Sequence, residues 1–302
     1  MALNDTIFYT YWLWYTTLGI GLAKSHYPQI KLVSRAHGYD LYENRHTPPY
    51  IPYRPQTLKH VEQLFLISNH GKNHIVNLFP CFASRCEVQK LGVADPGMMT
   101  PSAPDDVVRI ASCSFMVPVK RLDLLYRGLQ TTARLKPDHI FEWYHLGDGP
   151  TRAQIEALTQ AVNPSNLTCH FWGRLQNEEV MAFYKNHPID FFMNVSASEG
   201  IPLSIMEAQS CGIPVIATAV GGNPEIVSEE TGHLLSPNPT PTEIAAAIST
   251  ILDTPQALSQ KRLASRAMWQ TTYNADANYS AFAARLKSLL PHLNSSSESA
   301  TT

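Results

Sequence analysis

The hydrophobic pattern of the chain alternates between short apolar runs and longer amphipathic segments. The apolar runs are typical of buried strands in a parallel sheet, and the segments between them carry apolar residues at helical spacing. From residue 107 to residue 235 the alternation is regular and predicts six strands, whereas the part before it predicts only three or four. The expected fold class is therefore α/β, with parallel sheets and with ligands at the carboxyl ends of the strands.

The pattern also predicts where the elements and the domains begin and end. The predicted strands include 6–11, 30–35 and 63–68 in the first part, then 107–112, 140–146, 167–172, 190–195 and 214–218. The predicted helices include one ending near residue 26, then 71–79, 120–135, 177–187, 241–252, 255–269 and 276–290. A segment rich in Pro and Tyr, 47–55, is expected to be an irregular loop, and 95–106 is the expected linker.

These segments divide the chain into two Rossmann-like domains of unequal completeness. The expected parts are a partial N-terminal domain (1–105), a C-terminal domain (106–272), a helix packing back on the first domain (273–292) and a disordered tail (293–302).

Composition narrows the class of protein. The chain has 302 residues, 16% of them charged, and a net charge of −2, so it lacks the basic excess of a nucleic-acid-binding protein. Its five cysteines show no C-x-x-C spacing, which favours buried thiols in a reducing compartment. The apolar stretch 7–23 is long enough for a membrane-spanning segment, which is an alternative to the predicted strand and helix.

The most informative stretch is 190–235, which reads as strand, turn, helix, strand and turn. Glu199 lies just before the helix that Pro202 opens, and Glu207 lies in its second turn. The first N–H groups of that helix, around Leu203 and Ser204, have no intrahelical partner and form a favourable place for a phosphate. Gly221-Gly222 is expected to turn the chain into a further helix that begins at Asn223-Pro224.

These residues carry a resemblance to a known family. The segment EGIPLSIMEAQSCGIPVIAT, followed by GGNPE, resembles the donor site of retaining glycosyltransferases of the GT-B fold, family 4. The resemblance covers nearly the whole chain from about Thr6 and implies two Rossmann-like domains. The family's opening strands have no counterpart here, so the N-terminal domain is expected to lack its start.

The resemblance implies roles for individual residues. Lys120, in SCSFMVPVKR, would neutralise the diphosphate of the donor, and Arg121 is the candidate for a second cation because Phe115 stands where many members carry Arg. Glu207 would hold the ribose hydroxyls and Glu199 the donor sugar.

The resemblance further implies two sets of functional residues. His37, in SRAHGYD, resembles the family histidine that lies near the transferred sugar. The implied catalytic residues are His37, Lys120 and Glu199. The implied donor-binding residues are Arg121, Gly147, Arg174, Leu175, Gly200, Ile201, Pro202, Leu203, Ser204 and Glu207.

Motifs of several competing chemistries are missing from the sequence. There is no Asp-x-Asp pair for a metal-dependent glycosyltransferase, no P-loop motif and no G-x-G-x-x-G. We therefore expect no metal and no cofactor, and the resemblance implies a nucleoside-diphosphate sugar as substrate.

The predicted function is transfer of a sugar, with retention, from a nucleoside-diphosphate sugar to a glycan or lipid-linked acceptor in polysaccharide or cell-surface glycan biosynthesis. This is a hexosyltransferase-type activity. Two alternatives stay open: a non-catalytic remnant that binds nucleotide sugars, and a GT-B-like epimerase. The expected location is the cytoplasm, with peripheral association at the inner face of the plasma membrane as a further option, and no nucleic-acid partner is expected.

Overall fold

A computed structural model describes residue 3 and residues 6–103 and 105–290, so the predicted tail lies outside the described residues. The chain forms two compact units, Met1–Gly92 with Ala275–Thr302 and Val93–Asn274, and each is described here by itself. The segment 93–105, predicted to close the first domain, lies in the second unit. The reason is its contacts there: Thr100 N donates to Cys211 O (2.8 Å), and Asp95 pairs with Arg266 (2.6 Å).

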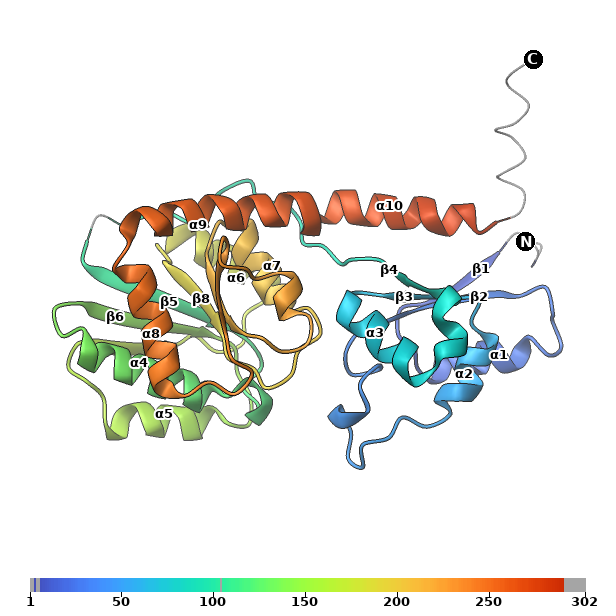
Figure 1. The fold of residues 1–302 in the computed structure, drawn as a ribbon, viewed down its shortest axis with the longest axis horizontal. Coiled ribbons are helices and arrows are strands. Elements are labelled where there is room, and N and C mark those ends of the chain that lie inside the picture. The colour runs from blue at the N-terminus through green and yellow to red at the C-terminus, as the bar shows by residue number, and fades with distance from the viewer. Residues whose placement is uncertain (1–2, 4–5, 104, 291–302) are drawn as a thin grey trace, which may run out of the picture. The chain divides into compact units, whose positions relative to one another are not determined.

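The first unit contains a parallel sheet of four strands in the order β1-β2-β3-β4 (Figure 1). The strands are β1 (Ile7–Thr10), β2 (Lys31–Ala36), β3 (Gln63–Leu66) and β4 (Cys86–Val88). The helices between them are α1 (Tyr15–Ala23), α2 (Arg54–His60) and α3 (Asn69–Leu78). Helix α2 begins in the segment expected to be an irregular loop.

Both faces of this sheet are covered, as a parallel sheet requires. On one face, Leu32 and Leu64 pack with Leu58 of α2 in a buried apolar cluster. On the other face, Val33 and Phe65 contact Phe282 of α10 (Ala275–Ser288). The stretch 7–23 forms β1, a loop and α1, and within the described residues no helix has the length and apolar character needed to cross a membrane.

The second unit contains a parallel sheet of six strands in the order β10-β9-β8-β5-β6-β7. The strands are β5 (Val107–Cys113), β6 (Ile140–Leu146), β7 (Leu167–Phe171), β8 (Phe191–Asn194), β9 (Val215–Thr218) and β10 (Gly232–Leu235). The predicted α/β class with parallel sheets is confirmed in both units.

Helices cover this second sheet on both faces (Figure 1). They are α4 (Leu122–Leu135), α5 (Arg152–Ala161), α6 (Asn177–Asn186), α7 (Leu203–Ser210), α8 (Pro241–Leu252) and α9 (Pro255–Met268). Helix α4 packs against α8, and α7 packs against α9. The core beneath α4 is apolar, with Trp143, Phe141 and Leu129 fully buried.

Two predicted helices differ from the structure at their first turns. Helix α4 begins at Leu122 because 118–120 forms a 3₁₀ turn and Arg121 adopts φ +49°. The helix expected at Asn223 is only a 3₁₀ turn, Asn223–Glu225. Side chains from elsewhere in the unit take the carbonyls that a longer helix would use: Tyr273 donates to Glu225 O (3.2 Å) and Gln209 to Ile226 O (2.8 Å).

Candidate functional site

The loop between β8 and α7 holds Glu199 in place through close backbone contacts. Gly222 N donates to Gly200 O at 2.7 Å. Gly221 has φ +55°, and a Cβ there would lie 1.9 Å from Glu199 O. Only glycine fits so close an approach at a positive φ. The Gly-Gly turn therefore fixes the path of the Glu199 loop.

Glu199 and Lys120, two predicted catalytic residues, form an ion pair. Lys120 Nζ lies 2.6 Å from Glu199 Oε1, and Asn194 Nδ2 donates to the same oxygen at 3.1 Å. Glu199 is only 7% exposed, so both partners compensate the loss of water around its carboxylate. The structure thus brings an ammonium group to a buried carboxylate at the carboxyl ends of β5 and β8.

Glu207 lies in α7, and one of its oxygens is already held. Asn177 Nδ2 donates to Glu207 Oε1 at 2.6 Å. Burial raises the pKa of Glu207, and the hydrogen bond from Asn177 lowers it in part. The first backbone hydrogen bond at the start of α7 runs from Ile205 N to Pro202 O, so the N–H groups of Leu203 and Ser204 precede the helical ladder.

The charges of Glu207 and Lys120 meet at the end of β5. Burial, with a smaller contribution from Glu207, raises the pKa of the Cys113 thiol to about 12, and the Lys120 charge opposes the rise. A lysine, two acids and a helix amino end are thus carried by the segments that follow β5 and β8 in the second unit.

The loops after β5, β6 and β7 are joined by their backbones. Gly147 has φ +152°, and a Cβ there would lie 1.9 Å from Ser114 O. Met116 N donates to Asp148 O (2.8 Å), and Gly147 forms an isolated bridge with Gly173. The predicted residues Arg174 and Leu175 follow that bridge, with Arg174 exposed and Leu175 partly buried.

Arg121 directs its guanidinium at the protein itself. It donates to Val195 O (2.6 Å), Ser196 O (2.7 Å) and Pro237 O (2.9 Å), and to Asn238 Oδ1 (3.1 Å). Burial lowers its pKa. To contact a diphosphate, Arg121 would have to release these acceptors. Its part in donor binding stays a prediction from the resemblance.

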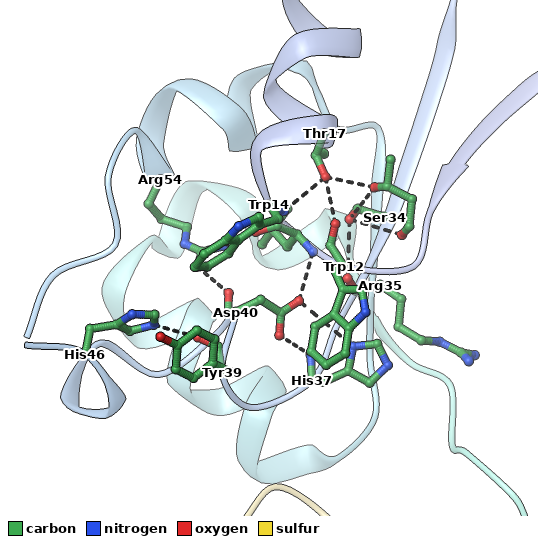
Figure 2. Close-up of polar contacts among 12 residues, drawn as sticks. Trp12, Trp14, Thr17, Ser34, Arg35, His37, Tyr39, Asp40, His46 and Arg54 are labelled. Carbon is green, nitrogen blue, oxygen red and sulfur yellow. Dashed lines mark hydrogen bonds and ion pairs between the residues drawn. The ribbon is translucent and has the colours of Figure 1, made fainter.

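His37 belongs to the first unit, at the end of β2, and is 8% exposed. Its backbone N donates to Asp40 Oδ1 at 2.8 Å (Figure 2), and its ring centroid lies 4.4 Å from those of Tyr11 and Trp12. Lys120 and Glu199 belong to the second unit, so His37 is described apart from them.

Sequence reasoning missed three polar residues that hold this machinery: Asn177, Asn194 and Asp40. Asn194 ends a buried strand, and a polar residue at such a position is a recognisable signal. Asn177 gives no such signal, because it meets Glu207 across 30 residues of sequence. Among the described residues, no group of three or more His, Cys, Asp or Glu side chains is arranged to hold a metal.

Comparison with protein families gives the class of this region. Residues 107–254 match the model of a family described as glycosyl transferases group 1. The matched segment spans β5 to α8 and includes Lys120, Glu199 and Glu207. This match supports a glycosyltransferase, a transferase of the EC 2.4 class.

Curated relatives point to the same class. The 2-deoxystreptamine glucosyltransferase of Streptomyces kanamyceticus is 35% identical over 117 residues, which cover 38% of this chain and 29% of the relative. A putative colanic acid biosynthesis glycosyltransferase, WcaL of Escherichia coli K12, is 25% identical over 217 residues, covering 69% and 52%. The chain thus spans about half the length, or less, of these relatives.

Solved structures share the fold of both units. Anabaena Alr3699/HepE in complex with UDP superposes with a TM-score of 0.71 at 17% identity, covering 90% of this chain and 76% of that one. A glycosyltransferase from Rickettsia africae gives 0.71 at 19% identity, covering 93% and 82%. The chain has the α/β fold of GT-B glycosyltransferases, with two units that each carry a parallel sheet.

Proposed function

We propose that this chain is a retaining glycosyltransferase of family 4 that moves a sugar from a nucleoside-diphosphate sugar to a hydroxyl of a glycan or lipid-linked acceptor. The observation that supports it most is the arrangement around α7. Glu199, a buried acid paired with Lys120, lies before the helix. Glu207 lies within the helix, and Asn177 donates a hydrogen bond to one of its oxygens. Those groups match the diphosphate, the sugar and the ribose of such a donor.

Each group has a defined task in the proposal. Asn177 holds Glu207 Oε1, so the other carboxylate oxygen is free to accept hydrogen bonds from the ribose hydroxyls. The N–H groups around Gly200 to Ser204 meet the sugar and the phosphates, as helix amino ends do with anions. Glu199 accepts a hydroxyl of the donor sugar.

Lys120 supplies the electrostatic part of the reaction. Cleavage of the bond to the sugar builds negative charge on the bridging oxygen of the leaving diphosphate, and a nearby ammonium group stabilises that charge. In the structure Lys120 pairs with Glu199, so a bound diphosphate shares the ammonium group with that carboxylate. We propose a same-face substitution assisted by the leaving group, without metal and without a covalent intermediate.

The acceptor and the location follow the relatives. WcaL is named for colanic acid biosynthesis, and an Erwinia amylovora relative, 23% identical over 270 residues, is named for amylovoran biosynthesis. We accordingly propose an acceptor in polysaccharide or cell-surface glycan biosynthesis. The reaction would take place in the cytoplasm, at or near the inner face of the plasma membrane.

Calorimetry with UDP tests the donor site, because UDP is bound in several of the similar structures. Glu207→Gln should weaken UDP binding by about 1–3 kcal/mol, since it removes a charge-assisted hydrogen bond to the ribose. Glu178→Gln, the same change on an exposed residue of α6, is the matched control. Equal affinities of the two variants would remove Glu207 from the donor site.

Product analysis by NMR separates the three candidate activities. Transfer to an added glycan acceptor supports the proposal. UDP binding without turnover on any acceptor indicates a binding remnant, and an isomerised sugar formed without acceptor indicates an epimerase.

A further inference from the structure

Asp40 lies in the loop that follows β2 and is almost fully buried, with 1% of its surface exposed. Each of its carboxylate oxygens accepts one backbone hydrogen bond. His37 N donates to Oδ1 and Leu13 N donates to Oδ2, both at 2.8 Å (Figure 2). The carboxylate thus bridges the two chain segments that leave β1 and β2, the first carrying Tyr11 and Trp12 and the second carrying His37.

The aromatic contacts of His37 depend on that bridge. Its ring lies 4.4 Å from both Tyr11 and Trp12, between ring centroids, and these two exposed rings lie just ahead of Leu13. Neither ring nitrogen of His37 has a hydrogen-bond partner among the described residues, although both nitrogens are buried. No side-chain hydrogen bond therefore orients the imidazole. Its place is set by the two rings, by its own backbone and by the Asp40 carboxylate, whose Oδ2 lies 3.9 Å from His37 Nδ1.

Arg54 fixes Asp40 from the other side. This guanidinium is 3% exposed and donates to Asp40 O and, at 3.5 Å, to Leu13 O. Burial lowers the pKa of Arg54, and the charge of Asp40 counteracts this. The guanidinium bonds the carbonyl of Asp40 rather than its carboxylate, so Arg54 holds the backbone of the two segments that the carboxylate bridges.

Asp40 and the two rings that contact His37 border a cavity. Tyr11, Trp12 and Asp40 help to line a cavity of about 570 Å³, together with Trp14 and Tyr39. We propose that Asp40 is a positioning residue, whose carboxylate holds the Tyr11–Leu13 segment against His37 and thereby presents the His37 ring for sugar transfer. The link to sugar transfer rests on the proposed function, which gives His37 its role; the positioning itself rests on the hydrogen bonds.

Asp40→Asn tests the bridge, because the amide keeps the shape of the carboxylate but turns one acceptor into a donor that faces a backbone N–H. NMR of the His37 ring protons reports the contact directly, since nearby aromatic rings displace their signals. We expect Asp40→Asn to move these signals toward those of a histidine free of ring contacts. Glu62→Gln, which removes a carboxylate from the exposed Lys24 ion pair of the same unit, should leave them unchanged.

Kinetics separate positioning from a general loss of structure. Asp40→Asn should lower kcat for transfer about tenfold or more, as displacement of a catalytic group does, with UDP affinity unchanged. Unchanged His37 signals, or a normal kcat, would overturn the proposal. If Asp40→Asn displaced the His37 signals but the wild-type protein showed no transfer, the positioning of His37 by Asp40 would be supported. The proposed function would be refuted.

A second variant covers the case in which Asp40→Asn does not fold. Asp40→Glu keeps the negative charge but moves both acceptor oxygens by one methylene group relative to His37 N and Leu13 N. Displacement of the His37 signals in this variant would support the proposal. Signals identical to those of the wild type would contradict it.

Discussion

The two units use the same parallel α/β layout but finish the carboxyl ends of their strands with different chemistry. In the second unit these ends carry charges, with Lys120 paired to Glu199 and Glu207 held by Asn177. In the first unit they carry aromatic rings, among them the exposed Tyr11, Trp12 and Tyr39. The strand order therefore determines where a site can form, and the loop residues determine what it can bind.

The loops are also fixed by different means. In the second unit, loop backbones contact one another directly. Glycines at 147 and 221 permit these contacts, since a Cβ at either position would lie 1.9 Å from a carbonyl oxygen. In the first unit, buried side chains bridge the loops, with Asp40 receiving two backbone N–H groups. The first arrangement suits a diphosphate that binds close to the backbone, whereas the second suits the support of large rings.

Substitution of Lys120 is the strongest test of the contrast between charged strand ends in the second unit and aromatic strand ends in the first. Lys120→Met should lower the rate of sugar transfer by about 10²-fold, because it removes the cation that we propose stabilises the leaving diphosphate. Steady-state kinetics with UDP-sugar measures the loss. The matched control is Lys136→Met, which breaks an ion pair with the exposed carboxylate of Asp253.

Loss of Lys120 also leaves Glu199 buried without its ionic partner, so the stability of the variant must be measured beside its rate. Near-normal turnover in a folded Lys120→Met protein would mean that another cation serves the diphosphate. It would also mean that the charged end of the second unit is structural rather than catalytic.

Arg121 sharpens the comparison because it is charged but directed at the backbone. Arg121→Asn keeps a residue that tolerates φ near +49° and removes the guanidinium from four acceptors. We expect a loss of about 2 kcal/mol in the free energy of unfolding, measured with urea, and little change in UDP affinity. A UDP affinity at least tenfold weaker, with stability kept, would instead make Arg121 the second cation that the resemblance implies.

Sequence alone predicted the class of fold and most strands because apolar runs and helical spacing are local patterns. It also predicted that Glu199 and Glu207 flank the start of one helix, since eight positions separate them along a single segment. The partners of these acids that come from other segments could not be predicted. Lys120 reaches Glu199 and Asn177 reaches Glu207 through the sheet order, and no pattern in one sequence states which loops become neighbours.

Local rules failed where tertiary contacts overrode them. Asn223-Pro224 has a good helix start, yet Gln209 and Tyr273 take the carbonyls that a helix would need. The Pro and Gly residues in 95–106 predict a linker. Contacts of Thr100 and Asp95 tie that segment to the second unit.

The smallest expected effect concerns the face of the first sheet that lies away from α1 and α2. Arg35 is 1% exposed, and its guanidinium lies 4.0 Å from the ring centre of Phe282. Two of its nitrogens have no hydrogen-bond partner within the part of the chain that the structure describes. Phe282→Leu keeps an apolar residue but removes that cation–π contact, so the first unit should lose about 1 kcal/mol in its free energy of unfolding. Tyr50→Leu, on an exposed ring of the same unit, should be neutral. If urea unfolding showed no difference between the two variants, aromatic rings would not stabilise the buried charge, and the contrast between the units would be confined to their strand ends.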